Sequence, residues 1–133
     1  MADMLVTMTN KFEAANWDEH NYVETEDGGK LALVKVNYKY GGQIEGETES
    51  RSLLTYLADG SGTFVGTELF TGTIEGKKGT VVFQHAGTFD AEHIVDNWTL
   101  APGTGTGELE GATGTGSFDM KMGTPSVEYT FTT

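Results

Sequence analysis

Residues 66–100 constrain the fold more strongly than any other stretch, because they predict three antiparallel strands joined by two tight turns. β-Branched and aromatic residues flank the first turn, Glu75-Gly76-Lys77-Lys78-Gly79-Thr80. If Lys77 and Lys78 are the loop residues, Phe70 lies opposite His85, and one face of the hairpin is apolar while the other is mostly polar. A one-residue slip would exchange the faces and bury threonines, so this register is our working prediction.

The second turn, Asp90-Ala91-Glu92-His93, continues the sheet and sets Asp96 opposite Gly87. Three polar side chains then stand on the otherwise apolar face: Glu68, His85 and Asp96. Diagonal neighbours in a sheet lie about 7–8 Å apart, within reach of long side chains. A buried ionisable group is costly unless it is paired or hydrogen-bonded. We therefore predict a polar cluster, whose members are the candidate catalytic residues.

Two interpretations of His85 remain open. It is either a packed histidine that hydrogen-bonds to one of the carboxylates, or a member of a general acid–base site. Large apolar side chains surround it on the same face and are predicted to form the barrel core and, secondarily, to contact a ligand. These candidate ligand-binding residues are Tyr38, Phe64, Phe70, Phe83, Phe89 and Trp98.

Composition supports an all-β protein with one domain over residues 1–133. The chain has 19 glycines and two prolines, and no segment shows sustained helical periodicity. Its formal net charge of -12 disfavours binding to nucleic-acid phosphates or anionic membranes. The chain has no cysteine, which excludes disulfides, thiol nucleophiles and cysteine metal sites.

The sequence lacks the usual motifs for targeting and for cofactors. Residues 1–6 have no basic region, and no stretch approaches the roughly 20 apolar residues of a membrane helix, so we expect a cytoplasmic protein. No phosphate loop, dinucleotide fingerprint or EF-hand is present, and no cofactor is predicted. Its three histidines lack metal-ligand spacing. A metal bound by Glu68, His85 and Asp96 is a minor alternative to a metal-free cluster.

The N-terminal half predicts further strands. Leu5–Trp17 alternates loosely and ends at the polar run Asp18–Asn21, while Leu31–Tyr40 and Ser52–Ala58 follow. Thr25–Gly29 is predicted to be a loop.

Gly41-Gly42 is typical of a two-residue hairpin turn. That turn would place Glu45 opposite Tyr38 and Glu47 two residues further along the apolar face. Either these glutamates line a cavity, or Gly46 marks a bulge that shifts the register.

The C-terminal part contains a weak repeat. The pattern of Gly72–Phe83 recurs as Gly107–Phe118, which predicts a second hairpin of similar design. Ser126–Phe131 is predicted to close the sheet onto the first strand. About eight strands without edge protection favour a single closed antiparallel barrel, of the lipocalin-like type, whose interior either packs with side chains or holds one small ligand.

Several glycine–aromatic runs resemble a family of uncharacterised bacterial proteins that adopt the allene oxide cyclase-like barrel. The runs are Gly60-x-Gly62-x-Phe64-x-Gly66-x-Glu68-x-Phe70-x-Gly72, Phe83-x-His85-x-Gly87-x-Phe89 and Trp98-Thr99-Leu100-x-Pro102-Gly103. The resemblance extends more weakly to 17–19 and 42–46, so it covers most of the chain. It implies the barrel fold and no activity, because the family has no assigned reaction. The plant cyclase is similar in architecture only.

Three functional hypotheses follow. The barrel binds a hydrophobic or weakly polar small molecule in an apolar cavity with Glu68, His85 and Asp96 as its polar groups. Alternatively, it is an isomerase or cyclase that uses a carboxylate or the histidine as general acid or base. In the third hypothesis it is a structural oligomer with a packed interior. Outward apolar residues such as Leu69 and Val82 indicate a homo-oligomer.

Overall fold

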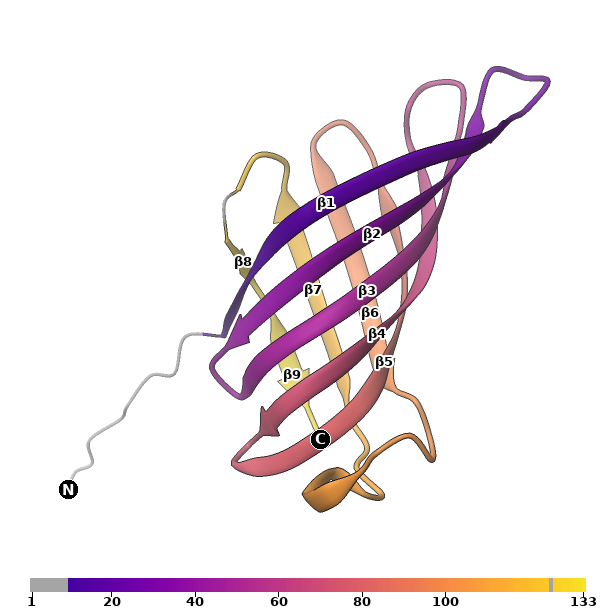
Figure 1. Ribbon diagram of the computed structural model, residues 1–133. Helices are drawn as coiled ribbons and strands as arrows, with labels where there is room; N and C mark the ends of the chain where they lie inside the picture. Colours follow the sequence, from indigo (N-terminus) through magenta and orange to yellow (C-terminus); the bar gives the residue numbers. More distant parts are fainter. Residues whose placement is uncertain (1–9, 125) are drawn as a thin grey trace.

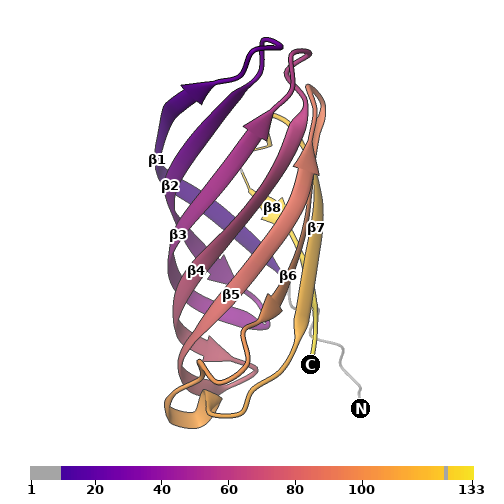
Figure 2. The same ribbon diagram turned by 90° about the vertical axis from the view of Figure 1, so that its right-hand side faces the viewer.

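A computed structural model describes residues 10–124 and 126–133, which form one antiparallel sheet in the order β8-β1-β2-β3-β4-β5-β6-β7-β9. The sheet curls into a nearly closed barrel of tilted strands (Figures 1 and 2). The all-β barrel prediction is confirmed, with nine strands rather than about eight. The strands are β1 (Lys11–Glu24), β2 (Lys30–Gly41), β3 (Ile44–Tyr56), β4 (Gly62–Ile74), β5 (Lys77–Phe89), β6 (His93–Leu100), β7 (Thr115–Lys121), β8 (Val127–Glu128) and β9 (Thr130–Thr132).

The C-terminal segment closes the barrel, as the sequence predicts. β8 pairs with β1 and β9 pairs with β7, so consecutive short strands reach both edges of the sheet. Tyr129 separates them, and its hydroxyl accepts a hydrogen bond from the Ile44 amide at 3.0 Å and donates one to the Gly41 carbonyl at 2.7 Å. These bonds tie the closing segment to the turn between β2 and β3.

The predicted register of β4 and β5 is wrong, although the predicted faces are right. Glu75 and Gly76 form the turn with φ of 50° and 82°, so His85 lies opposite Gly66 instead of Phe70. A tight hairpin with positive φ at both loop positions matches strand twist and favours glycine there. The shift is an even number of residues, so the inward set is unchanged. The predicted β5–β6 register, with Asp96 opposite Gly87, is confirmed.

The predicted pairing of β2 with β3 is also wrong. Tyr38 lies opposite Thr48 instead of Glu45. The turn is Gly42-Gln43 and Tyr40 lies opposite Gly46, so β3 has one more residue than β2 between the turn and this pair. This odd shift exchanges the faces of β3, and Glu45 and Glu47 are exposed on the outer face. This extra residue beside Gly46, whose φ is 153°, agrees with the bulge interpretation, and neither glutamate lines the cavity.

Two strands are longer than predicted. β1 continues through the polar run Asp18–Asn21 to Glu24, and β3 is continuous from Ile44 to Tyr56. The distal half of β1 is almost entirely exposed, so it pairs with β2 without the apolar alternation that marks a half-buried strand. Residues 5–9 of the predicted first strand lie outside the described residues. The predicted Thr25–Gly29 loop is present.

The predicted hairpin over Gly107–Phe118 does not form. Gly107–Leu109 is instead a short 3₁₀ turn in the connection between β6 and β7. The Thr106 amide donates to the Thr80 carbonyl at 2.8 Å, which holds the connection against β5, and Leu109 is buried there. Gly72 and Gly79 lie within β4 and β5, whereas Gly107 and Gly114 lie in this connection, so the sequence repeat does not correspond to a structural repeat.

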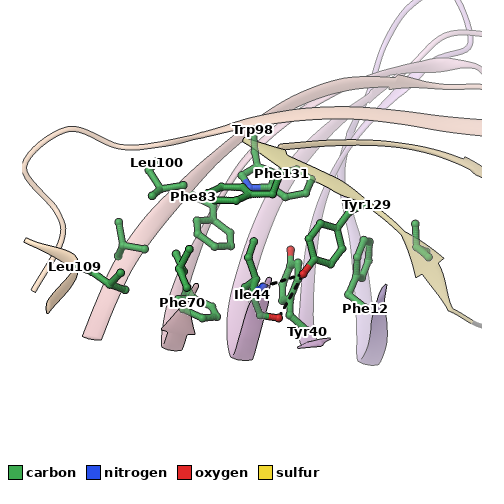
Figure 3. Close-up of a cluster of buried hydrophobic side chains, with 13 residues drawn as sticks. Phe12, Tyr40, Ile44, Phe70, Phe83, Trp98, Leu100, Leu109, Tyr129 and Phe131 are labelled. Atoms are coloured by element: carbon green, nitrogen blue, oxygen red, sulfur yellow. Dashed lines mark hydrogen bonds between the residues drawn. The ribbon is translucent and has the colours of Figure 1, made fainter. Parts of the chain in front are cut away.

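One half of the barrel interior is tightly packed. Aromatic rings from both edges of the sheet meet there, and Leu109 packs against them at one end (Figure 3). The buried residues of this packed half include Tyr40, Ile44, Phe70, Phe83, Trp98, Leu109, Tyr129 and Phe131. In the part of the chain that the structure describes, no helix is long and apolar enough to cross a membrane.

Candidate functional site

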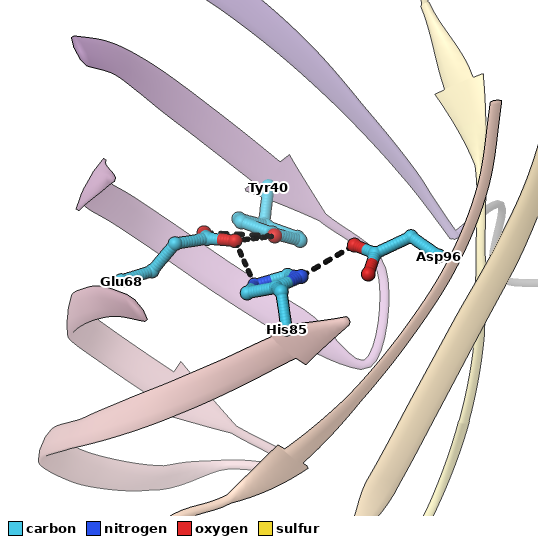
Figure 4. A network of polar contacts seen from close by, with 4 residues as sticks. All are labelled: Tyr40, Glu68, His85 and Asp96. Carbon is cyan, nitrogen blue, oxygen red and sulfur yellow. Dashed lines mark hydrogen bonds and ion pairs between the residues drawn. The ribbon is translucent and has the colours of Figure 1, made fainter. Parts of the chain in front are cut away.

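Four inward side chains form a buried polar cluster in the middle of the barrel (Figure 4). Glu68 lies on β4, His85 on β5, Asp96 on β6 and Tyr40 on β2. Each is surrounded along its strand by apolar inward residues, because side chains two positions apart share a face. The acidic pair is almost fully buried, with 1% of Glu68 and 2% of Asp96 exposed.

His85 bridges the two carboxylates. Its Nε2 contacts Oε2 of Glu68, and its Nδ1 contacts Oδ2 of Asp96. On the far side of Glu68, the Tyr40 hydroxyl donates to Oε1 at 3.0 Å and approaches Oε2 at 3.4 Å. The structure thus brings together the three residues that the sequence singles out, and both oxygens of Glu68 have partners.

The charges of the cluster determine its protonation. Burial by itself lowers the pKa of His85, but the charge of Glu68 and the hydrogen bonds that the ring donates to both carboxylates raise it to about 9. Burial raises the pKa of Asp96, and the contact with His85 offsets part of this increase. Burial, followed by the charge of Glu68, raises the pKa of Tyr40 well above its ordinary value, so the phenol stays neutral. At neutral pH the protonated ring of His85 therefore lies between the side chains of Glu68 and Asp96.

Two atoms of the cluster have no hydrogen bond of ordinary geometry among the described residues, and one of them, Nε2 of His85, is in the ion pair with Glu68. Oδ1 of Asp96 is buried and has no hydrogen-bond partner among the described residues. Because buried carboxylate oxygens normally accept hydrogen bonds, this atom is the part of the cluster best placed to accept one from a ligand.

A cavity of about 190 Å³ lies against the cluster in the other half of the barrel. Its walls are mostly apolar and aromatic, and exposed residues of β1 and of the β7–β8 connection mark its opening to the surface. The lining includes Trp17, Val34, Tyr38, Ser50, Ser52, Leu54, Tyr56, Phe64, Glu68, His85, Phe89, Ile94, Asp96, Phe118, Met120 and Met122.

The predicted ligand-binding residues divide between the two halves. Tyr38, Phe64 and Phe89 line the cavity. By contrast, Phe70, Phe83 and Trp98 belong to the packed half and are fully or almost fully buried. The cluster lies at the boundary, as β5 shows: Phe89 lines the cavity, His85 touches it, and Phe83 is packed.

Sequence reasoning missed Tyr40 as a partner of Glu68. The alternation along β2 could have identified Tyr40 as an inward residue, because it lies on the same face as Tyr38. The contact itself joins strands that are not neighbours in the sheet, and strand pairing alone does not reveal contacts across a barrel.

The cluster geometry does not support the minor metal interpretation. Glu68 and Asp96 occupy opposite ring nitrogens of His85, so the three donors do not converge on one point. Within residues 10–124 and 126–133, no group of three or more histidine or carboxylate side chains is arranged to hold a metal ion.

Comparisons with known proteins agree on the family. Residues 8–132 match the family described as "Protein of unknown function (DUF3224)". A crystal structure of a DUF3224-family protein of unknown function from Shewanella oneidensis MR-1 superimposes with a TM-score of 0.76 at 26% sequence identity, covering 93% of this chain and 94% of that chain. No curated protein matches the sequence. Because the family match covers nearly the whole chain, this protein belongs to the DUF3224 family, as the glycine–aromatic runs predicted.

Proposed function

We propose that this barrel binds a compact, largely apolar small molecule in the cavity above the Glu68–His85–Asp96 cluster. The observation that carries the proposal is the unequal filling of the interior. One half is packed with rings, while the other half keeps a cavity of about 190 Å³ that ends on buried ionisable groups. Buried charges and unfilled space both reduce stability, and a binding function accounts for their occurrence together.

The size of the cavity restricts the ligand. Typical pockets for drug-sized ligands enclose about 300–1,000 Å³, whereas an apolar cavity of about 150 Å³ accommodates benzene. A cavity of about 190 Å³ therefore suits a molecule with one ring and a few further atoms. The packed-interior hypothesis describes only the other half of the barrel.

The proposal is tested with a pair of tryptophan substitutions on β6. Ile94 lines the cavity and Val95 points outward from the next position, so Ile94→Trp fills the cavity while Val95→Trp adds the same ring outside. Native mass spectrometry of protein from its own host, followed by denaturing extraction, should show a bound small molecule in the wild type and in Val95→Trp. It should be absent from Ile94→Trp.

A second measurement tests for binding in case the native ligand dissociates during purification. Titration of the wild type with benzene, toluene and phenol, followed by NMR, should give saturable shifts at cavity residues that Ile94→Trp abolishes. If the native protein carries no small molecule and none of these compounds binds saturably, the proposal is wrong.

The free oxygen of Asp96 favours one further candidate function, an isomerase or cyclase. A buried carboxyl group with a raised pKa and one unpaired oxygen facing a small cavity is suited to moving a proton. Asp96→Asn should then abolish turnover of the extracted ligand while its binding persists. If the extracted molecule is unchanged after incubation with the wild type, this candidate is rejected and the binding function stands.

A further inference from the structure

Through its described lining residues, the cavity offers its ligand a free carboxylate oxygen as acceptor but no free positively charged donor. Both ring nitrogens of His85 contact carboxylates, and the Tyr40 hydroxyl donates to Glu68. The side chains that line the cavity include no lysine or arginine. Apart from the neutral hydroxyls of Tyr38, Ser50 and Ser52, the described groups at the bottom of the cavity are therefore already engaged or can only accept a hydrogen bond.

The net charge of the groups at the bottom of the cavity is negative. Two carboxylates flank a single imidazolium, and the neighbouring phenol of Tyr40 is neutral. A carboxylate or phosphate ligand would place further negative charge next to Glu68 and Asp96, away from bulk water and without a free cation to neutralise it. Such a ligand is strongly disfavoured.

Oδ1 of Asp96 requires a donor. Asp96 is 98% buried, lines the cavity, and leaves this oxygen without a partner among the described residues. A buried carboxylate oxygen without a hydrogen bond carries its full desolvation cost, which a charged N–H donor reduces most effectively.

The aromatic walls favour the same kind of ligand. The rings of Tyr38, Phe64 and Phe89 line the cavity, and an ammonium group is attracted to the faces of such rings. At the edge of the cavity, Tyr56 donates its hydroxyl to Oε2 of Glu19 at 2.7 Å, which adds another carboxylate near the ring-lined wall.

We infer that the ligand is a compact protonated amine with an apolar body, whose N–H group donates to Oδ1 of Asp96. The body fills the ring-lined part of the cavity, and the ammonium group compensates the excess negative charge of the cluster. This inference rests on the proposed binding function and names the class of ligand.

Three probes of similar size separate the possibilities: benzylamine, toluene and benzoate. Titrations of the wild-type protein at pH 7, followed by NMR or calorimetry, should show benzylamine binding roughly tenfold or more tightly than toluene, as expected for a charge-assisted contact. Benzoate should show no saturable binding. If toluene and benzylamine bind equally, or if benzoate binds more tightly than benzylamine, the inference is overturned. In either case the binding function stands. If none of the three binds, the inference is wrong, and the binding function is wrong as well if the native protein carries no small molecule.

Paired variants locate the preference. Asp96→Asn should remove the preference for benzylamine over toluene, because the neutral amide gives a weaker acceptor in the same position. Asp119→Asn is the matched control, since Asp119 is an exposed acid beside another histidine, His93, with 2.9 Å between its Oδ1 and Nδ1. A preference that persists in a folded Asp96→Asn protein overturns the inference. If that variant does not fold, the comparison of probes on the wild type still decides.

Discussion

Nε2 of His85 contacts Oε2 of Glu68 although the two residues are not cross-strand partners. The β4–β5 ladder sets His85 opposite Gly66 and Glu68 opposite Phe83, so the contact runs diagonally between neighbouring pairs. A Cβ added at Gly66 would lie 2.5 Å from Oγ of Ser52 and 2.6 Å from the carbonyl oxygen of Arg51, both on β3. The glycine opposite His85 therefore allows β4 to pack closely against β3 at this position.

This contact predicts how His85 titrates. Burial lowers the pKa of His85, and the charge of Glu68 is the largest effect that raises it to about 9. Glu68→Gln should therefore lower the His85 pKa, as measured by NMR titration of the ring protons. Glu49→Gln, which removes an exposed carboxylate from the outer face of β3, is the control and should leave it unchanged. An unaltered pKa in Glu68→Gln would refute the assigned ion pair.

The stability of the fold should fall as the pH rises through about 9. The pKa of His85 is raised from an ordinary 6.5 to about 9, so its stabilising contribution is complete below pH 6.5 and is lost as the pH passes 9. The raised pKa of Asp96 acts in the same direction, because the folded state binds that proton more readily. The tyrosines nearest the cluster, Tyr38 and Tyr40, have raised pKa values and stay neutral over this range.

Urea unfolding measured at pH values from 6 to 10 checks this prediction. The free energy of unfolding should decrease by on the order of 3 kcal/mol across the interval, and a His85→Gln variant should lose most of the dependence. A stability that is flat or rises over this interval would contradict the predicted protonation of the cluster.

Packing against Trp98 predicts that Gly116 does not tolerate a side chain. A Cβ at Gly116 would lie 2.1 Å from Cε2 and Cζ2 of the indole, which is buried and pairs across β6 and β7 with this glycine. Gly116→Ala should destabilise the barrel by about 1–3 kcal/mol in chemical denaturation. Gly41→Ala is the control, because the nearest atom to its added Cβ outside the adjacent residues is the Lys11 carbonyl oxygen, 3.9 Å away. Equal stability of the two variants would argue against this packing.

Closure of the barrel depends on the hydroxyl of Tyr129. Its removal in Tyr129→Phe leaves the buried amide of Ile44 without its acceptor and should cost about 1–3 kcal/mol. The exposed Tyr22, substituted by Phe in the same way, should change stability very little. Thermal unfolding of both variants measures the difference, and identical midpoints would show that the closing bonds contribute nothing.

The expected homo-oligomer has a testable surface. The outward residues of β4 are all uncharged threonines and aliphatics, including the exposed Val65 and Leu69. In a chain of net charge -12, this face offers the least repulsion between two copies. Light scattering should show an oligomer for the wild type and a monomer for Leu69→Lys, with Asn21→Lys on the exposed part of β1 as control. A wild type that is monomeric would remove the expectation.

The sequence by itself determined the class of fold and the set of inward residues. Alternation along a strand has a period of two, so Glu68, His85 and Asp96 share the inner face under any even shift of register, and the predicted cluster survived an incorrect β4–β5 pairing. On β3 the error was odd, so the predicted faces were exchanged there and the glutamates proved to be outside.

Only the tertiary structure decided the rest: the register at each turn, the Tyr40–Glu68 hydrogen bond, the free oxygen of Asp96, and the division between cavity and packed core. The physical reason is that alternation is a local property of the chain, whereas these features depend on backbone φ at a few turn residues and on how side chains from non-neighbouring strands fill one enclosed volume.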